Sequence, residues 1–415
     1  MKEAIVFVES SGSGAGEATA LAARELGFVP IVLGRDLTTY PFLAELSITS
    51  LRADTKSQDA LLETCLQLGQ DYKLAGVGTT AEYYAEIAAS IAKQLQLPGP
   101  NPESVTTCRE KDRMRAALQK TNLNPRYYLV ETPEEAAAAT ESLGPPVIIK
   151  PTILSGSALV QLCKDVDDAC QYARKLLQVE FIDGFDMPRH ILVEEYVDGP
   201  EFSVEVFNGE SLGVTKKKLG PPPFFVEIGH DFPADLDDYS WNAVTEAALE
   251  AAAAIGLLWG PAHIDVKLGS KGPRIIEVNP RMAGGRIPYL IKYATGGDFA
   301  SAYVSGLTGR SSKLERTRRA SASIRFVTVP GNGIFNGVTG LEAARRMDGV
   351  LDFKMTGQIG KNYKLRCSNG DRIGYVIAVG DCIRESATRA ETALEYVRLL
   401  WDFEPSRGAP VTSTV

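Results

Sequence analysis

The chain has 415 residues, of which 44% are hydrophobic and 23% are charged, and its formal net charge is -8 at pH 7. This composition describes an ordinary globular protein with room for two or three domains, each able to bury its own core. There is no basic excess to recruit nucleic acid and no long apolar run to cross a membrane, so neither partner is expected.

The six cysteines are scattered along the chain without the spacing of metal ligands. No signal-peptide pattern is visible in the sequence. Unpaired, widely spaced thiols of this kind are typical of a reducing compartment. We therefore expect a cytoplasmic protein.

The first hundred residues alternate strand and helix patterns. An apolar run at 4–8 is followed by a Gly/Ser-rich stretch at 10–16, an Ala/Leu-rich helix that ends before Gly27 and a second strand at 29–33. A further strand at 74–78 with a helix after it repeats the alternation. The pattern predicts a small parallel α/β sheet. The glycine spacing does not match a nicotinamide-binding loop, so a tight turn that lines a cleft is the simpler interpretation.

The Pro-rich phrase at 97–102 predicts a domain boundary. A helix beginning near Ser104 carries Lys111, and a second helix begins at Thr132, with Pro133 in its first turn and Glu135 completing a capping box.

An apolar strand at 147–150 ends on a lysine, Lys150, and a short loop containing Ser155, Gly156 and Ser157 follows. A strand that leads into a small flexible loop suits a mobile lid over phosphates, with the lysine as a compact positive charge. For Lys111 or Lys150 taken alone, a surface role is the simpler alternative.

Two strands at 191–197 and 201–207 are separated by an Asp-Gly-Pro turn. The second alternates regularly, which places Glu201, Ser203 and Glu205 on one face.

The segment at 216–233 contains Glu227 and His230 in a chain with only three histidines. A glutamate can bind an ammonium group, and a histidine with a pKa near its ordinary value can accept a proton from it. The alternative is a structural pair that takes no part in chemistry.

After an Ala-rich helix at 241–255, two strands at 263–268 and 274–278 predict a β-hairpin. With a five-residue loop at 269–273, Asp265 lies opposite Glu277, and Asn279 shares their face. Two carboxylates and an amide oxygen are ligands that suit Mg²⁺, which completes its shell with water and phosphates. Arg281 adds a planar, permanently charged guanidinium group beside them. The alternative is a solvated hairpin face with a salt bridge.

Beyond about residue 310 we expect short strands, a helical stretch at 341–346, a strand at 371–379 and a final helix at 386–400. No catalytic motif is visible in this part.

Together the motifs resemble the ATP-grasp superfamily. Asp265, Glu277, Asn279 and Arg281 followed by Gly284 and Gly285 are similar to its metal and phosphate signature. Lys111, Lys150, the Ser155–Ser157 loop and the phrase EEYVDGPEFSVE occur in the order and approximate spacing of such a domain, so the resemblance covers about residues 100–310.

The resemblance implies an α/β and α+β protein with the ATP-grasp fold. It places an N-terminal parallel α/β (pre-ATP-grasp) domain at 1–100, the ATP-grasp domain at 101–310 with a mobile lid at about 147–190, and a β-rich C-terminal subdomain at 311–415.

The resemblance also implies roles for individual residues. Glu194, the Glu195 carbonyl and the Val197 amide would face adenine, and Glu201 the ribose. Lys111, Lys150 and the lid residues would hold the phosphates, and Asp265, Glu277 and Asn279 the metal. Arg281 would stabilise the reacting acyl group. FVEIGHDFPA, which contains Glu227 and His230, resembles the segment beside the amine substrate in peptide-forming ligases.

The implied activity is the ATP-dependent coupling of a carboxylate to an amine through an acyl phosphate, with ADP and phosphate as products. The sequence looks most like L-amino-acid ligases that form dipeptides. This resemblance implies small-molecule substrates, with ATP and Mg²⁺ as cofactors and Mn²⁺ as the alternative ion. It is also compatible with a homodimer. The alternatives are a purine-pathway or other carboxylate-amine ligase of this fold, and a non-catalytic nucleotide-binding protein.

Overall fold

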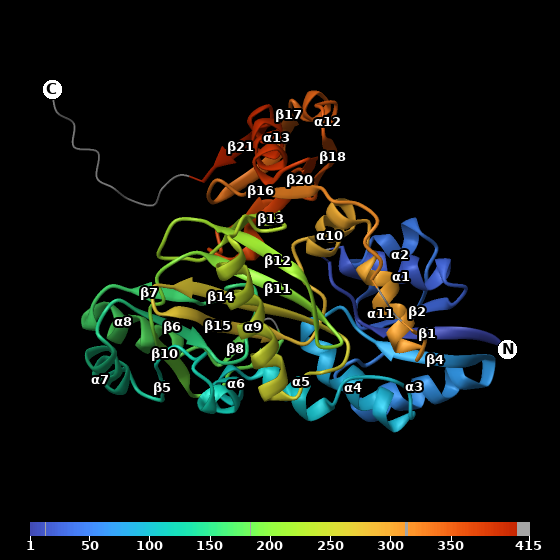
Figure 1. Ribbon diagram of the computed structural model, residues 1–415, viewed down its shortest axis with the longest axis horizontal. Helices are drawn as coiled ribbons and strands as arrows, with labels where there is room; N and C mark the ends of the chain where they lie inside the picture. The colour runs from blue at the N-terminus through green and yellow to red at the C-terminus, as the bar shows by residue number, and fades with distance from the viewer. Residues whose placement is uncertain (13, 183, 312–313, 405–415) are drawn as a thin grey trace.

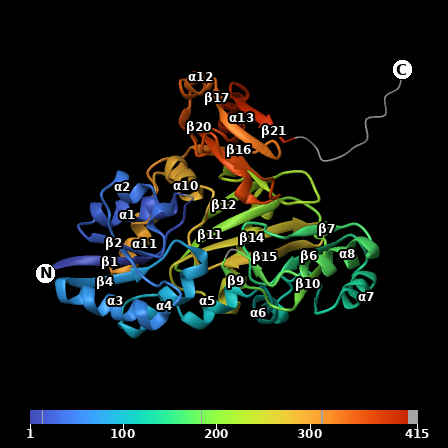
Figure 2. The same cartoon turned by 180° about the vertical axis from the view of Figure 1, so that it is seen from behind.

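The computed structural model describes residues 1–12, 14–182, 184–311 and 314–404. Figure 1 shows an N-terminal α/β part, a central part built on two sheets and a C-terminal lobe that stands above them. Seen from behind, the N-terminal part lies on the left, the central part on the right and the C-terminal lobe above them (Figure 2). Within the described ranges, no helix has both the length and the apolar character needed to cross a bilayer.

The N-terminal part is a four-stranded parallel sheet in the order β3-β2-β1-β4. Its strands are β1 (Lys2–Val8), β2 (Val29–Gly34), β3 (Thr49–Arg52) and β4 (Tyr72–Gly78). The connecting helices are α1 (Ala15–Glu25), α2 (Phe42–Glu45), α3 (Gln58–Asp71) and, after β4, α4 (Ala85–Gln94). The predicted parallel sheet is therefore present.

Both faces of this sheet are covered, as a parallel sheet requires. The side chains of α3 and α4 bury one face, with Leu61 and Ile91 fully enclosed. On the other face α1 packs together with two later helices, α10 (Ile287–Thr295) and α11 (Phe299–Leu307), which follow the predicted metal hairpin in sequence. The N-terminal sheet is thereby fixed next to the end of that hairpin.

The central part begins with two short helices, α5 (Pro102–Arg109) and α6 (Lys111–Ala117), where a single helix was expected. They are separate because Glu110 has an extended backbone (φ -94°, ψ 104°). Lys111 is consequently the first residue of α6 and not an interior residue of a longer helix.

A four-stranded antiparallel sheet follows, in the order β5-β10-β6-β7. Its strands are β5 (Tyr127–Val130), β6 (Val147–Pro151), β7 (Gln161–Cys163) and β10 (Ile191–Glu195), and α7 (Pro133–Leu143) and α8 (Val166–Leu176) cover one face. A small hairpin, β8 (Phe181–Ile182) and β9 (Phe185–Asp186), lies between α8 and β10 in the sequence. The Thr132 hydroxyl caps α7 as predicted, but the Glu135 carboxylate accepts from the Glu131 amide, one residue before the expected donor.

The largest sheet has eight strands in the order β15-β14-β11-β12-β13-β16-β20-β18. Its strands are β11 (Glu201–Phe207), β12 (Glu210–Leu219), β13 (Glu227–Phe232), β14 (Pro261–Gly269), β15 (Gly272–Asn279), β16 (Ser321–Thr328), β18 (Val350–Met355) and β20 (Arg372–Gly380). The long helix α9 (Asp238–Ile255) packs its alanine-rich face on β11, β12 and β14. Hydrogen bonding therefore continues from the predicted metal hairpin into the C-terminal strands.

The C-terminal lobe adds a three-stranded sheet, β19 (Asn362–Tyr363), β17 (Gly333–Thr339) and β21 (Arg398–Phe403), with α12 (Leu341–Arg345) and α13 (Ile383–Glu395). The final helix was expected to run to Leu400, but it ends at Glu395. Residues from Arg398 pair with β17 as an edge strand because Leu399 and Trp401 pack into the lobe's core.

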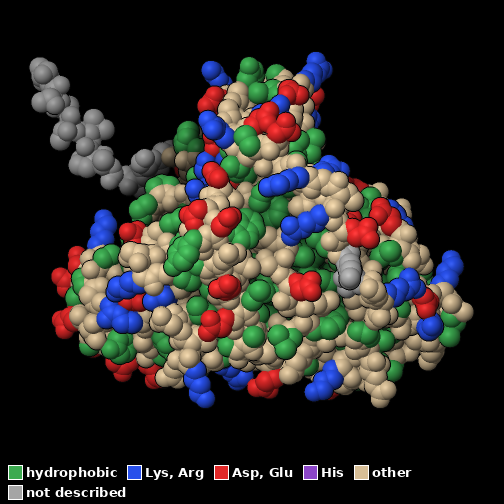
Figure 3. Space-filling view, in the orientation of Figure 1, with side chains coloured by type: hydrophobic (Ala, Val, Ile, Leu, Met, Phe, Trp, Pro, Cys, Tyr) green, Lys and Arg blue, Asp and Glu red, His purple; other side chains and the backbone are tan. Residues whose placement is uncertain are grey.

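Domain boundaries at about 100 and 310 stay predictions. Because β13 and β16 pair directly across residue 310, any C-terminal subdomain shares its sheet with the preceding part. On the face drawn in Figure 3, basic and acidic side chains are interspersed.

Candidate functional site

A cavity of about 490 Å³ lies where the N-terminal part, the two central sheets and the C-terminal lobe meet. Every residue that the sequence assigned to the site lines it: Lys111, Lys150, Ser155, Gly156, Ser157, Glu194, Glu195, Val197, Glu201, Glu227, His230, Asp265, Glu277, Asn279 and Arg281. The structure thus brings the predicted residues together, while their individual roles stay predictions.

The hairpin of β14 and β15 places Asp265 directly opposite Glu277, with His263 opposite Asn279. The turn between the strands is shorter than expected, because Gly269 already pairs with Gly272. A β-bulge at Ile276 restores the predicted pairing beyond it. The Asn279 Nδ2 donates to the His263 carbonyl at 3.3 Å, which leaves the Asn279 Oδ1 available as an oxygen ligand.

Each carboxylate of the hairpin is held by a lysine. The Lys111 Nζ lies 2.7 Å from a Glu277 oxygen. Burial alone would raise the pKa of Glu277, but Lys111, Lys150 and Arg281 outweigh it and hold that pKa at about 2. Glu277 is therefore fully ionised at neutral pH.

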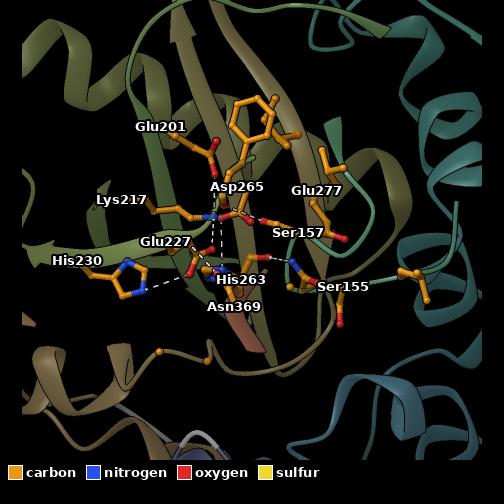
Figure 4. Close-up of a pocket in the computed structure, with 18 of the residues that line it drawn as sticks. Ser155, Ser157, Glu201, Lys217, Glu227, His230, His263, Asp265, Glu277 and Asn369 are labelled. Carbon is orange, nitrogen blue, oxygen red and sulfur yellow. Dashed lines mark hydrogen bonds and ion pairs between the residues drawn. The ribbon is translucent and has the colours of Figure 1, made fainter. Parts of the chain in front are cut away.

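Lys217, which no sequence motif indicated, lies at the centre of three carboxylates (Figure 4). Its Nζ is 2.8 Å from Glu201, 2.9 Å from Glu227 and 3.0 Å from Asp265. Burial opposes its charge, yet the three carboxylates raise the pKa of Lys217 well above its ordinary value. Since one ammonium serves three acids, burial still prevails at Asp265 and raises its pKa to about 6.

A second ion cluster lies beneath the predicted adenine strand β10. Glu194 accepts from the Arg115 Nε at 2.8 Å and from the Lys150 Nζ at 2.8 Å, and all three side chains are buried. Burial lowers the pKa of Lys150 to about 8, although Glu194 opposes the shift. The Arg115 Nη1 and Nη2 also donate to the carbonyls of Ile275 and Ile276 at the bulge, at 2.8 and 3.1 Å. Arg115 therefore joins β10 to the hairpin.

The predicted lid loop is held over the cavity from three directions. Ser155 contacts the Tyr83 hydroxyl, with its amide at 3.3 Å and its Oγ at 3.2 Å. The Ser157 Oγ donates to the Phe225 carbonyl at 3.0 Å, and the Asn369 amide donates to the Gly156 carbonyl at 3.3 Å. The loop thus contacts the N-terminal part, the segment before β13 and the C-terminal lobe.

Glu227 is already neutralised in this structure. It pairs with Lys217 and with Arg372 from β20, whose Nη2 lies 2.7 Å away. Burial would raise the pKa of Glu227, but these two cations hold it well below its ordinary range. An ammonium substrate would have to share Glu227 with both.

His230 does not have the ordinary pKa assumed from the sequence. Burial lowers the pKa of His230 to about 3, and Glu227, 3.4 Å from Nε2, only partly opposes this. The ring packs edge-on to Phe326 and against Gly285, where an added Cβ would lie 2.5 Å from Nε2. Within the described residues neither ring nitrogen has a hydrogen-bond partner, so a neutral imidazole faces the cavity.

Some functional candidates were missed because their signal is not local. His263 is the exception, because the alternation of the strand in the sequence already places it on the same face as Asp265. Lys217 lies among three adjacent lysines, 216–218, and only the sheet order reveals which one points inward. Asn369 and Arg372 come from a C-terminal part in which no catalytic motif was seen.

The donor set suits Mg²⁺. Among the residues that the structure describes, no three His, Cys, Asp or Glu side chains form a complete metal cage. The carboxylates of Asp265 and Glu277 on opposite strands and the amide oxygen of Asn279 can supply part of the coordination shell of an ion that takes its other ligands from phosphates and water.

Comparison with known proteins gives two family matches. Residues 143–288 match the ATP-grasp domain, and residues 325–402 match the L-amino acid ligase C-terminal domain 2.

An uncharacterized protein of Sinorhizobium fredii is 30% identical over 406 residues, 98% of this chain and 84% of that protein. The alanine-anticapsin ligase of Bacillus amyloliquefaciens is 26% identical over 267 residues, 59% of this chain; that match spans only 56% of the ligase.

The crystal structure of L-amino acid ligase from Bacillus licheniformis superposes with a TM-score of 0.82 at 20% identity, over 97% of this chain and 99% of that one. This likeness concerns the fold and confirms the predicted fold class.

Proposed function

The chain belongs to the ATP-grasp carboxylate-amine ligases, and from this premise we propose that it couples an amino acid to a second amino acid, forming a dipeptide with release of ADP and phosphate. What carries the proposal is one cavity in which the facing Asp265 and Glu277 are surrounded by Lys111, Lys217 and Arg281. The match of residues 325–402 favours an amino-acid ligase over a purine-pathway ligase. A non-catalytic binding protein would have no need of the proposed metal ligands.

The nucleotide is proposed to lie between β10 and the hairpin. Glu194, Glu195 and Val197 would face adenine, and Glu201 the ribose. Lys150 keeps its charge at neutral pH because its pKa is about 8, so Lys111 and Lys150 can both bind phosphate oxygens. A phosphate that draws Lys111 away would free Glu277 for the metal.

Asp265, Glu277 and Asn279 would hold Mg²⁺. When bound, Mg²⁺ offsets the negative charge on the phosphate oxygens during transfer. Mn²⁺ has the same ligand preference for carboxylate and carbonyl oxygens.

In the first proposed step a carboxylate oxygen of one substrate attacks the γ-phosphorus, and the bond to the ADP oxygen breaks. The lid residues Ser155, Gly156 and Ser157 would exclude water from the resulting acyl phosphate. In the second step the amine attacks the acyl carbon, loses a proton and expels phosphate. Arg281 would stabilise the oxyanion that forms on that carbon.

Glu227 and His230 are proposed to receive the amine. A ring nitrogen of the neutral His230, which has no hydrogen-bond partner among the described residues, can accept a hydrogen bond from the amine, and Glu227 supplies negative charge beside it. Because the pKa of His230 is about 3, the proton that the amine loses is proposed to leave with the phosphate. We place the reaction in the cytoplasm, where the six free cysteines stay reduced.

The experiment is to measure ADP and phosphate release with a panel of amino acids, singly and in pairs. A correct pair should stimulate release far above either amino acid alone. Hydroxylamine should trap the acyl phosphate of the carboxylate substrate as a hydroxamate. Formation of AMP, or no stimulation by any pair, would contradict the proposal.

A further inference from the structure

The cations that line the cavity fall into two groups. Lys111, Lys150, Lys217, Arg281 and Arg372 each have a carboxylate partner within 4 Å. Arg286 and Lys267 also line the cavity, yet across the described ranges neither forms an ion pair with an acidic side chain. These two positive charges are available to a ligand.

The two unpaired cations lie at different ends of the site. The Lys267 Nζ donates to the Val197 carbonyl at 3.1 Å and lies over the Tyr196 ring at 4.8 Å, so it belongs to the end assigned to the nucleotide. Arg286 immediately precedes α10. Through Arg115, Glu194 of β10 is joined to β15 at one edge of the eight-stranded sheet, whereas α10 packs on β13 and β16 farther along that sheet, and Figures 1 and 2 show the two elements well apart. Arg286 therefore faces the end left for the organic substrates.

The Arg286 guanidinium is held in place by rings and not by acids. Its Cζ lies 4.3 Å from the centre of the Tyr375 ring and 5.2 Å from that of Tyr289. On another side the backbone of Gly14 approaches so closely that an added Cβ would lie 3.3 Å from both Cζ and Nη1. Aromatic contacts fix a guanidinium through its faces. One side of the Arg286 guanidinium also interacts with the Tyr289 hydroxyl, and its other N–H groups can donate to a ligand.

The backbone at Arg286 is unusual as well. Its φ of 58° is in the left-handed region that non-glycine residues seldom adopt. Such a conformation is strained and persists where surrounding structure enforces it, commonly at ligand sites.

The acids that interact with its two ring partners form no ion pair with Arg286 in the described part of the chain. The Asp352 carboxylate accepts from the Tyr375 hydroxyl at 2.6 Å, and Glu17 acts on the Tyr289 phenol. Both lie on other elements, β18 and α1.

We infer that Arg286 binds a non-reacting oxyanion of an organic substrate, a carboxylate or phosphate group that is distinct from the carboxylate being activated. This inference rests on the proposed ligase function. The oxyanion has two possible sources, the α-carboxylate of the amine substrate or an acidic side chain on either substrate. Arg286 is then a specificity-determining residue, because its planar fork matches either group with two hydrogen bonds.

The test compares Arg286→Gln and Arg286→Lys with the wild type in steady-state kinetics. Each active amino acid is paired with a neutral analogue: the amine substrate with its carboxamide, aspartate with asparagine, and O-phosphoserine with serine. The first comparison identifies an α-carboxylate and the other two an acidic side chain.

Arg286→Gln should lower kcat/KM about 10- to 100-fold for the acid-bearing substrate, leave its neutral analogue unchanged and leave the KM for ATP unchanged. Arg286→Lys should restore part of the loss. Lys267→Met should show the converse, a raised KM for ATP with substrate preference retained. The control is Arg310→Gln, since Arg310 stacks on Phe28 away from the cavity and should change neither constant.

Equal losses for acid and analogue, or no loss for any substrate, would overturn the inference while leaving the ligase function standing. If no amino-acid pair supports turnover, the proposed function fails and Arg286 is judged by calorimetry. L-aspartate and O-phosphoserine are then titrated into protein saturated with ADP and Mg²⁺. Binding that is lost in Arg286→Gln supports the inference, and binding that is absent or unaffected by the substitution contradicts it.

Discussion

The guanidinium of Arg281 and the carboxylate of Glu82 form a largely buried ion pair between segments 199 residues apart in the chain. Glu82 lies in the short 3₁₀ turn Glu82–Tyr84 after β4, and Arg281 is the second residue after the end of β15. A residue of the N-terminal part thus orients the arginine that we propose acts on the acyl group.

We expect Glu82→Gln to lower kcat by about 10- to 100-fold with little change in the KM for ATP, because Arg281 loses the charged partner that positions it. Steady-state ADP release measures both constants. Breaking a buried pair also leaves an uncompensated charge, so the thermal midpoint should fall. The exposed Glu86, on the neighbouring helix, supplies the control Glu86→Gln. Unchanged kcat in Glu82→Gln would contradict the positioning role.

Glu277→Gln should reduce ATP turnover by orders of magnitude and leave the fold intact, because the proposed metal site loses one ligand charge. Asp265→Asn should act in the same direction. Circular dichroism checks the fold and ADP release the turnover, with Glu210→Gln on the exposed start of β12 as the control. A folded Glu277→Gln protein with wild-type turnover is incompatible with the metal assignment.

Glu227→Ala and His230→Ala should slow dipeptide formation and raise the KM for the amine substrate, while the KM for ATP changes little. The reason is that both residues are proposed to contact the amine and neither the nucleotide. Arg372→Met, alone and combined with Glu227→Ala, completes a double-mutant cycle for their 2.7 Å pair. If ATP binding weakens as much as amine binding, both residues have a structural role instead.

The depressed pKa of His230 predicts a pH-dependent stability. The unfolded chain binds a proton at His230 below its ordinary pKa of 6.5, whereas the folded protein does so only below about 3. The contribution of His230 is therefore fully present above pH 6.5 and lost as the pH falls towards 3, with a slope of at most about 1.4 kcal/mol per pH unit. Urea unfolding across this range should show a shallower pH dependence in His230→Gln than in the wild type. Parallel curves would contradict the buried, neutral state.

The local patterns that sequence reveals were sufficient for most elements, since β1, β11 and α9 lie where periodicity placed them. Pairing was harder to predict. Asp265 lies opposite Glu277 as expected, but the backbone that produces this pairing differs, because a tight turn and a bulge at Ile276 replace the five-residue loop. Backbone hydrogen bonding at the bulge depends on Arg115, which no local pattern of the hairpin contains.

The same reason explains which site residues could not be predicted. Lys217 gains its importance only when β12 lies between β11 and β13, which brings Glu201, Glu227 and Asp265 around one ammonium. Arg372 lines the cavity and Glu82 pairs with the cavity residue Arg281, yet both come from parts of the chain that carry no recognisable motif. The depressed pKa of His230 follows from burial, a property of the assembled structure.

The two-turn helix α6 fixes the distance between the proposed adenine end and the proposed phosphate end of the site. Its first residue, Lys111, reaches Glu277, while Arg115, one turn later on the same face, reaches Glu194 and the bulge. Inserting one residue between them would rotate Arg115 by about 100° about the helix axis and break the second set of contacts. Evolution can therefore lengthen or shorten the loops around this site, but the four-residue interval between Lys111 and Arg115 should stay constant wherever both contacts are kept.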